Sequence, residues 1–190
     1  MNVQMILGSF AAGSSKLSAA LASLFLFAQF AVATRTHFVA NKEISPGLTL
    51  LGVTSVLGFV SFLYFLEETD RISLSAFFAY AFSQLAFIWT KKSTQTASLG
   101  LAYSRDLPHA LVEAGPYKWI RHPFYSSYIL YWVGNAFAAP TLAQWVICGM
   151  LCVIYFCAAR FEERKFYQSP LRKAYEEYRE RTTMFVPYVL

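Results

Sequence analysis

A short run of residues that could do chemistry, from Gly115 to Tyr125, stands directly before a long apolar stretch. It contains Arg121 and His122, and Pro123 follows where an apolar helix would begin. Proline fits the first position of a helix because its missing N–H costs nothing there. His122 would then stand at the helix mouth, where free backbone N–H groups and the helix dipole favour an anion. Ionisable groups at the edge of a membrane segment are usually functional, although this pair could also simply anchor the helix at lipid headgroups.

A second charged cluster ends the next apolar run, where Glu162 and Glu163 follow it without a break. An acidic pair at the C-terminal end of a helix opposes the helix dipole and therefore requires a cationic partner. Arg160 and Glu163 are three residues apart and can share one helix face. The partner could instead be a cationic ligand, or the pair could form a local salt-bridged cap with Arg164 and Lys165. Because the two clusters end neighbouring segments on the same side, we expect them to form the rim of one polar pocket.

The elements that must hold these clusters are membrane helices. Of the 190 residues, 56% are hydrophobic and 14% are charged, against about 45–50% and about 25% in an ordinary soluble domain. A membrane span takes about 20 apolar residues. The chain has several stretches near this length, and they predict an all-α integral membrane bundle of about five transmembrane helices whose last two form a tight hairpin: 17–34, 48–66, 72–90, 124–139 and 141–159. Met5–Ala12 is too short to span, and we expect it to lie on the membrane surface.

The positive charges predict the orientation, because cytoplasmic loops of membrane proteins are enriched in Lys and Arg. With the N-terminus outside, nearly all of the 16 Lys and Arg residues fall in cytoplasmic segments, Lys16 and Arg71 being the exceptions. We therefore expect an outer N-terminus, a cytoplasmic C-terminus and both charged clusters at the cytoplasmic face. The net charge of +5 fits this topology and contact with anionic lipid, so nucleic acid is not indicated. The length of the first stretch favours an uncleaved helix over a signal peptide.

The chain is predicted to be a single membrane domain. Its parts are three N-terminal spans, a cytoplasmic loop, the helical hairpin and a cytoplasmic tail: 1–90, 91–123, 124–159 and 160–190. In the tail, Pro170 fits the first turn of a new helix. Tyr175 and Tyr178 then recur at helical spacing, which predicts a C-terminal amphipathic helix. We expect this helix to lie on the membrane surface or to fold over the rim of the pocket.

The predicted pocket offers three kinds of group to a ligand. Arg121 and the helix mouth suit a carboxylate, one of the glutamates suits a positive group, and Tyr117 suits stacking on a flat ring. S-adenosylmethionine is a small molecule that carries all three features. A loop histidine such as His109 indicates little by itself. The three cysteines of the last span lack the histidine or carboxylate neighbours of a metal site, so we expect packing roles for them and no metal.

A set of short motifs between His109 and Pro187 resembles the isoprenylcysteine carboxyl methyltransferase family, which includes phospholipid methyltransferase-like membrane proteins. The motifs are His109-Ala110-Leu111-Val112, Gly115-Pro116-Tyr117, Arg121-His122-Pro123-Phe124-Tyr125, Glu162-Glu163 and Tyr175-x-x-Tyr178. The resemblance implies a membrane methyltransferase with S-adenosylmethionine as its cofactor. It also implies that the loop 91–123, the mouth of the hairpin and the tail hold this cofactor together.

The resemblance also implies which residues contact the cofactor: His109, Ala110, Leu111, Val112, Tyr117, His122, Pro123, Phe124, Tyr125, and Glu162 or Glu163. The spacing to Tyr175 favours Glu163 over Glu162. Arg160 is the nearest match to the family's substrate-binding arginine, and Arg160 or Arg121 could orient an acceptor carboxylate by bidentate contact. An amine or thiol acceptor would need deprotonation by a glutamate. The catalytic candidates are therefore Arg160, Arg121 and Glu163.

The expected reaction is an in-line transfer of a methyl group from a sulfonium to a membrane-embedded or lipid-like acceptor. Since the sulfonium is already a strong electrophile, the protein must mainly align the two partners and exclude water. Carboxyl O-methylation of a prenylcysteine-like substrate is the first expectation. The alternatives are N-methylation of a phospholipid or amine, S-methylation of a thiol, reduction of a membrane lipid with NADPH, and a scaffold without catalysis.

Overall fold

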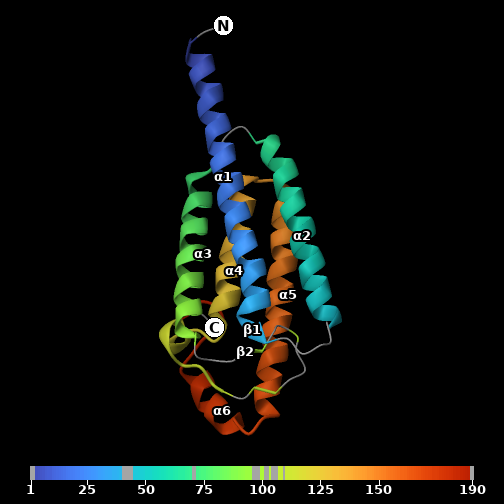
Figure 1. Ribbon diagram of the computed structural model, residues 1–190, viewed down its shortest axis with the longest axis vertical. Coiled ribbons are helices and arrows are strands. Elements are labelled where there is room, and N and C mark those ends of the chain that lie inside the picture. The colour runs from blue at the N-terminus through green and yellow to red at the C-terminus, as the bar shows by residue number, and fades with distance from the viewer. Residues whose placement is uncertain are drawn as a thin grey trace.

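The computed structural model describes residues 3–39, 45–69, 72–95, 99–100, 103, 107–108 and 110–188. Its long helices run lengthwise and side by side (Figure 1): α1 (Val3–Thr36), α2 (Pro46–Glu67), α3 (Leu74–Ser93), α4 (Pro123–Ala138) and α5 (Leu142–Tyr167). One end carries the 3₁₀ helix η1 (Gly115–Lys118), the helix α6 (Arg172–Glu180) and a two-residue parallel pair, β1 (Phe38–Val39) with β2 (Leu99–Gly100). The predicted all-α helical bundle is confirmed.

The local sequence explains where the helices begin. Ser45 caps α2 by accepting a hydrogen bond from a first-turn N–H, and Pro46 takes the first helical position. Thr141 caps α5 in the same way. Pro123 opens α4 as predicted, and only Ala139–Thr141 separate α4 from α5. The predicted tight hairpin is therefore confirmed.

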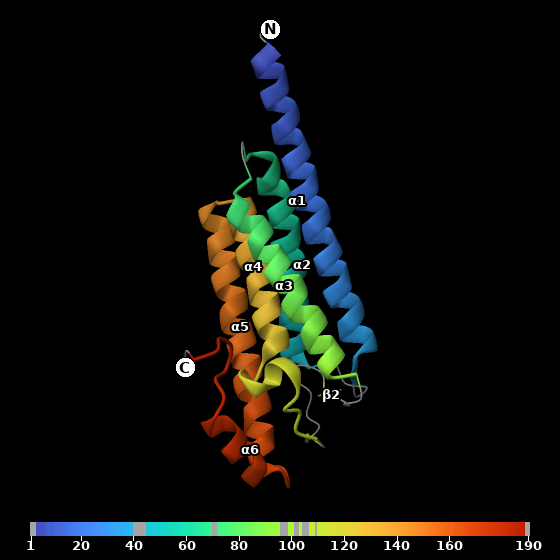
Figure 2. The same ribbon diagram turned by 90° about the vertical axis from the view of Figure 1, so that its left-hand side faces the viewer.

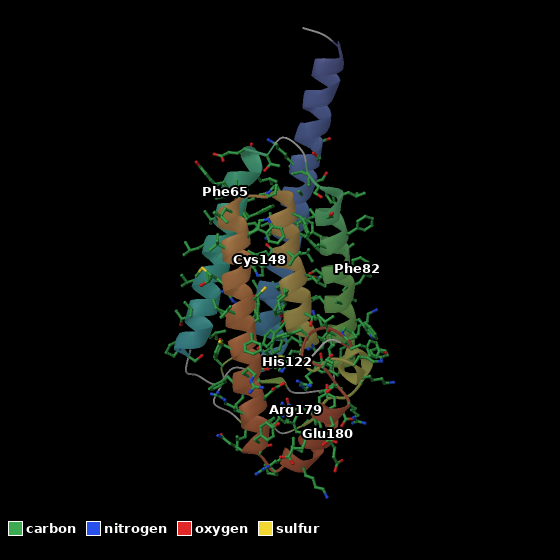
Figure 3. All side chains as sticks on the ribbon, turned by 180° about the vertical axis from the view of Figure 1, so that it is seen from behind. Phe65, Phe82, His122, Cys148, Arg179 and Glu180 are labelled. Carbon is green, nitrogen blue, oxygen red and sulfur yellow. The ribbon has the colours of Figure 1, made fainter. Side chains whose placement is uncertain are left out.

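The outward side of the bundle is apolar. Among the described residues, three helices are long and apolar enough to cross a membrane, namely α1 over Gly13–Thr36, α2 and α5. Large side chains such as Leu57, Phe82 and Val153 are more than half exposed, and Figure 3 shows Phe82 pointing away from the bundle. So much exposed apolar surface suits contact with lipid rather than water. A count of five spans stays a prediction, because neither α3 nor the 16-residue α4 is among these three helices.

Helix α4 is the centre of the bundle and lies between α3 and α5 (Figure 2). A polar cluster crosses its core, where the amide oxygen of Asn135 accepts hydrogen bonds from Ser23 on α1 at 2.9 Å and from Tyr80 on α3 at 2.8 Å. The hydroxyl of Tyr131 lies 3.0 Å from that of Ser23. Hydrogen bonds of this kind hold helices together where lipid surrounds them. They fix α1 and α3 against α4.

Two details differ from the sequence-based expectation. Met5–Ala12 forms no separate surface segment, because it is the first part of α1, a continuous helix of 34 residues that extends beyond the other helices (Figures 1 and 2). Extending an existing helix avoids the cost of a new nucleus. Pro170 lies outside α6, which begins at Arg172, because Ser169 first closes a turn with the next N–H groups. The predicted C-terminal helix itself is confirmed.

Replacing Gly134 by alanine tests the close packing of α4 on α3. A β-carbon at this position would lie 2.6 Å from Cε1 of Tyr80, so the ring would have to move and its hydrogen bond to Asn135 would weaken. We expect the free energy of unfolding in detergent to fall by about 1–3 kcal/mol. The control is Gly149→Ala in α5, where a β-carbon would meet nothing within 4 Å. Equal stability of the two variants would contradict this packing.

Candidate functional site

The two charged clusters meet at the end of the bundle that lies opposite the N-terminus (Figures 1 and 2). The tail after α6 returns there and pairs with the residues before α4. Thr183 donates from its N–H to the carbonyl of Trp119 at 3.0 Å, and the N–H groups of Arg121 and His122 donate to the carbonyls of Thr183 and Met184 at 2.8 and 3.1 Å. This short parallel pairing fixes Arg121 and His122 at the mouth of α4.

The chain segment that leads to residues 119–122 turns at Gly115. Its φ is +60°, and a β-carbon would lie 1.9 Å from the hydroxyl of Ser93 at the end of α3. Glycine adopts this conformation without steric cost. The following turn, η1, presents the carbonyl of Tyr117 to the hydroxyl of Tyr178, which donates to it at 2.7 Å. Since Tyr175 and Tyr178 are both buried, α6 folds over the rim of the site, which was one of the two predicted placements.

An ion cluster joins the mouth of α4 to the last turns of α5. The Nε of Arg121 lies 2.8 Å from Glu163 Oε1, and these side chains are only 8% and 3% exposed. The ring nitrogens of His122 lie 3.6 Å from Glu162 Oε2 and 3.5 Å from Glu163 Oε1. Arg160, which is 46% exposed, reaches Glu163 Oε2 at 3.5 Å. The predicted convergence of both clusters is therefore present, and three cationic side chains surround Glu163.

Arg121 makes hydrogen bonds to both α5 and the tail. Besides Glu163, its guanidinium donates to the carbonyls of Thr182 and Arg179 in the tail. A planar guanidinium with several fixed donors suits such simultaneous contacts. These contacts assign Arg121 to holding the tail and Glu163 in place, whereas Arg160 keeps its outer face in solvent.

His122 is nine-tenths buried and has a raised pKa. Its Nε2 forms no hydrogen bond with any described residue, although Glu163 lies nearby. Burial acts to lower the pKa of His122, but the carboxylates of Glu162 and Glu163 outweigh burial, so the pKa is raised above its ordinary value of 6.5. The imidazole thus favours its cationic form and keeps one N–H donor available for a ligand.

A row of aromatic rings leads from His122 into the bundle. The ring of His122 stacks on Tyr125 with centroids 5.6 Å apart, and Tyr125 stacks on Tyr155 at 5.5 Å. The Tyr125 hydroxyl donates to Glu162 Oε1. Tyr128 continues the row, and its buried hydroxyl has no hydrogen-bond partner among the described residues. The site therefore combines a charged rim with an aromatic interior.

The other predicted cofactor residues lie at the margin of this arrangement. Ala110 is exposed, and Leu111 and Val112 are half-buried in the stretch before η1. Pro123 and Phe124 are buried, and Phe124 packs against Phe38 and Phe87, on the side of α1 and α3. The contact predicted for His109 lies outside the described residues.

Sequence reasoning missed Tyr128, Tyr155 and the tail strand that carries Thr183. Tyr155 stands about two helical turns before Glu162, so both residues share one face of α5. Tyr128 stands about one turn after Tyr125 in the same way. This spacing was a usable signal for both tyrosines. The sequence shows no comparable periodicity around Thr183, because so short a backbone pairing leaves no pattern.

Comparison with known families gives one match. Residues 72–176 match the family described as phospholipid methyltransferase. The match covers more than half of the chain and includes α3, η1, α4 and α5, and so the whole ion cluster of Arg121, His122, Glu162 and Glu163. A comparison with curated proteins finds no match.

The ionisation of His122 can be measured by NMR titration of labelled histidine in micelles. We expect a midpoint above 6.5, whereas His37 should titrate below 6.5, because burial and then Lys91 lower its pKa. A raised pKa means that the His122 interaction stabilises the fold fully below about pH 6.5 and is lost as pH rises through the folded pKa. Glu162→Gln should lower the His122 midpoint. A midpoint at or below 6.5 in the wild type would contradict the cluster.

The contribution of Glu163 to stability can be tested by neutralising it. Glu163→Gln leaves two buried cationic groups without their shared carboxylate, so we expect the free energy of unfolding to fall by about 3–5 kcal/mol. The control is Glu176→Gln, which removes the solvent-exposed pair with Arg172 and should change stability little. Denaturant unfolding in detergent gives both values. A cost for Glu163→Gln as small as that of the control would show that the pair is not buried.

Proposed function

The chain belongs to the phospholipid methyltransferase family, and we propose that it transfers a methyl group from S-adenosylmethionine to a lipid-like acceptor in the membrane. Isoprenylcysteine carboxyl methyltransferase-like proteins fall in the same family, in agreement with the motif resemblance. Membrane methyltransferases of this family act on lipid-like substrates. The observation that carries the proposal is the buried His122 at a helix mouth, whose Nε2 makes no hydrogen bond with a described residue, beside two carboxylates and a row of aromatic rings.

The residues at the mouth of α4 fit the polar groups of S-adenosylmethionine. No side chain of the described residues caps α4, so the backbone N–H groups of Phe124 and Tyr125 can bind a carboxylate together with the cationic His122. Glu162 can accept hydrogen bonds from an ammonium or from hydroxyl groups, and Tyr117 offers a ring face. When bound, the cofactor supplies an electrophilic methyl group. The protein then has to orient it and exclude water, and the tail, which pairs with residues 119–122 beside the mouth of α4, can help to cover a ligand there.

Of the two glutamates, Glu162 is the better candidate for cofactor contact. Its side chain is 23% exposed, and its described partners are His122 and the Tyr125 hydroxyl. Glu163 already accepts hydrogen bonds from Arg121 and Arg160. We therefore assign Glu162 to the ligand and Glu163 to positioning the cations, although the motif spacing favoured Glu163.

For the acceptor, we propose a prenylcysteine-like carboxylate. A carboxylate needs no general base. Arg160, half-exposed at the edge of the cluster, can orient such a group by charge-assisted hydrogen bonds. An amine acceptor would instead need a group that takes up a proton. Glu162 is the nearest such group.

The distribution of Lys and Arg supports an outer N-terminus and a cytoplasmic site. We also propose that the chain is one domain, because α4 contacts α1, α3 and α5 in one core. A cytoplasmic site would take its soluble cofactor from the cytosol and its acceptor from the inner leaflet.

Cofactor binding can be measured by titration calorimetry on the protein in nanodiscs. We expect Glu162→Gln and His122→Ala to weaken S-adenosylmethionine binding by about 10- to 100-fold, as expected for the loss of a hydrogen bond to a charged group. Glu180→Gln, on the exposed end of α6 (Figure 3), is the control and should bind like the wild type. A wild-type protein that is folded and binds no S-adenosylmethionine would refute the proposed function.

The acceptor can be identified with radiolabelled S-adenosylmethionine and a panel of prenylcysteines, phospholipids and lipid thiols. We expect label in a base-labile ester of the prenylcysteine. Arg160→Gln should raise KM for this acceptor more than it lowers cofactor affinity. Transfer only to a phospholipid amine would reject the carboxylate acceptor and keep the methyltransferase.

A further inference from the structure

Tyr103, outside the ion cluster, has a strained backbone. Its φ is 58°, in the left-handed region that a bulky side chain rarely adopts. Its hydroxyl donates to the carbonyl of Ile154 at 2.9 Å, and its ring centroid lies 5.8 Å from that of Phe161. Both partners belong to α5. These side-chain contacts offset the backbone strain.

The Tyr103 ring also packs on the beginning of α2. A β-carbon at Gly47 would lie 2.6 Å from Cδ1 of Tyr103, so the ring lies directly on the α2 backbone. Burial raises the pKa of Tyr103, and Cys157 and Glu162 raise it further. The phenol therefore lies between α2 and α5, close to the part of α5 that carries the ion cluster.

Farther from the site, α2 and α5 contact each other directly. Gln144 donates to the hydroxyl of Ser61 at 3.0 Å, and a β-carbon at Gly58 would lie 2.9 Å from Ile147. Toward the site α2 leans away from α5 (Figure 1). Tyr103 therefore acts as a wedge between the two helices where they diverge.

The other sides of the cluster are closed by helix-to-helix contacts. Tyr125 and Tyr155 stack between α4 and α5, and the hydroxyl of Ser83 on α3 donates to the carbonyl of Ser127 on α4 at 2.8 Å. Phe30 on α1 packs on Tyr128 with centroids 4.7 Å apart. Between α2 and α5, by contrast, the contact nearest the cluster is made by the Tyr103 side chain, which contacts both helices.

We propose that Tyr103 is a specificity-determining residue: the hydrocarbon chain of the acceptor reaches the methyl-transfer site between α2 and α5, and the Tyr103 ring limits which chains fit. This inference rests on the proposed function. The occupant is apolar because α2 and α5 face lipid on their outer sides, and Gly47 and Phe161 present no polar side chain to it. A ring that is held by contacts on two helices can exclude a bulky chain by its volume alone.

Two substitutions should change the chain-length preference in opposite directions. Tyr103→Ala removes the ring and should raise kcat/KM for a longer prenylcysteine relative to a shorter one by about tenfold. Gly47→Ala adds a methyl group against the ring and should lower the same ratio. Tyr103→Phe keeps the ring and should keep the wild-type ratio. Gly52→Ala is the control on α2, since a β-carbon there would meet nothing within 4 Å.

Two further readouts on the same samples separate this inference from the proposed function. Calorimetric binding of S-adenosylmethionine should be unchanged in all four variants, because no substitution touches the mouth of α4. Affinity for the unreactive prenylcysteine methyl esters, which needs no turnover, should follow the same chain-length order as kcat/KM. If cofactor binding and melting temperature stay at wild-type values while the chain-length profile of both Tyr103→Ala and Gly47→Ala is unchanged, the assignment of Tyr103 is overturned and the methyltransferase stands.

Discussion

The buried ion pair between Arg121 and Glu163 is the interaction on which the candidate site depends. It lies at the end of an apolar bundle, where an unpaired charge would be strongly destabilising. Arg121 comes from the mouth of α4, Glu163 from α5, and Nη1 of Arg121 donates to two carbonyls of the tail. Three segments that are distant in sequence are thus held by one guanidinium. The helix mouth, the carboxylates and the tail strand must therefore assemble together.

This pairing gives the two adjacent glutamates different tasks. Glu163 is enclosed by cations and serves the structure, whereas Glu162 shares its carboxylate with His122 and Tyr125 and stays partly exposed. Neighbouring residues on a helix point about 100° apart, so one turn of α5 can present a structural and an available carboxylate at once. The length of α5 matters for the same reason. Its last turns continue past the apolar part of the helix and bring the glutamates level with the start of the shorter α4.

Much of the fold was predictable from the sequence, because apolar length and helix-start residues act locally. The apolar runs predicted the long helices, Pro123 predicted the start of α4, and the charged clusters predicted where the site would form. The partner of each charge was not predictable, since Arg121 could have faced lipid, ligand or protein. The pairing of Thr183 with Trp119 and the wedge at Tyr103 depend on contacts between distant segments, which leave no periodic trace. The extension of α1 was not predictable from apolar length, because Met5–Ala12 is too short to span by itself and the sequence does not mark it as a continuation of the helix.

The proposed function depends on one arrangement, in which His122 and the N–H groups in the first turn of α4 face a bound nucleotide-derived donor. A structure determined by cryo-electron microscopy with S-adenosylhomocysteine tests this most directly. The account predicts ligand density with its carboxylate against the N–H groups of Phe124 and Tyr125 and against His122, and with its ammonium or ribose beside Glu162. Density bound elsewhere on the chain, with the mouth of α4 still closed by protein groups, would contradict it.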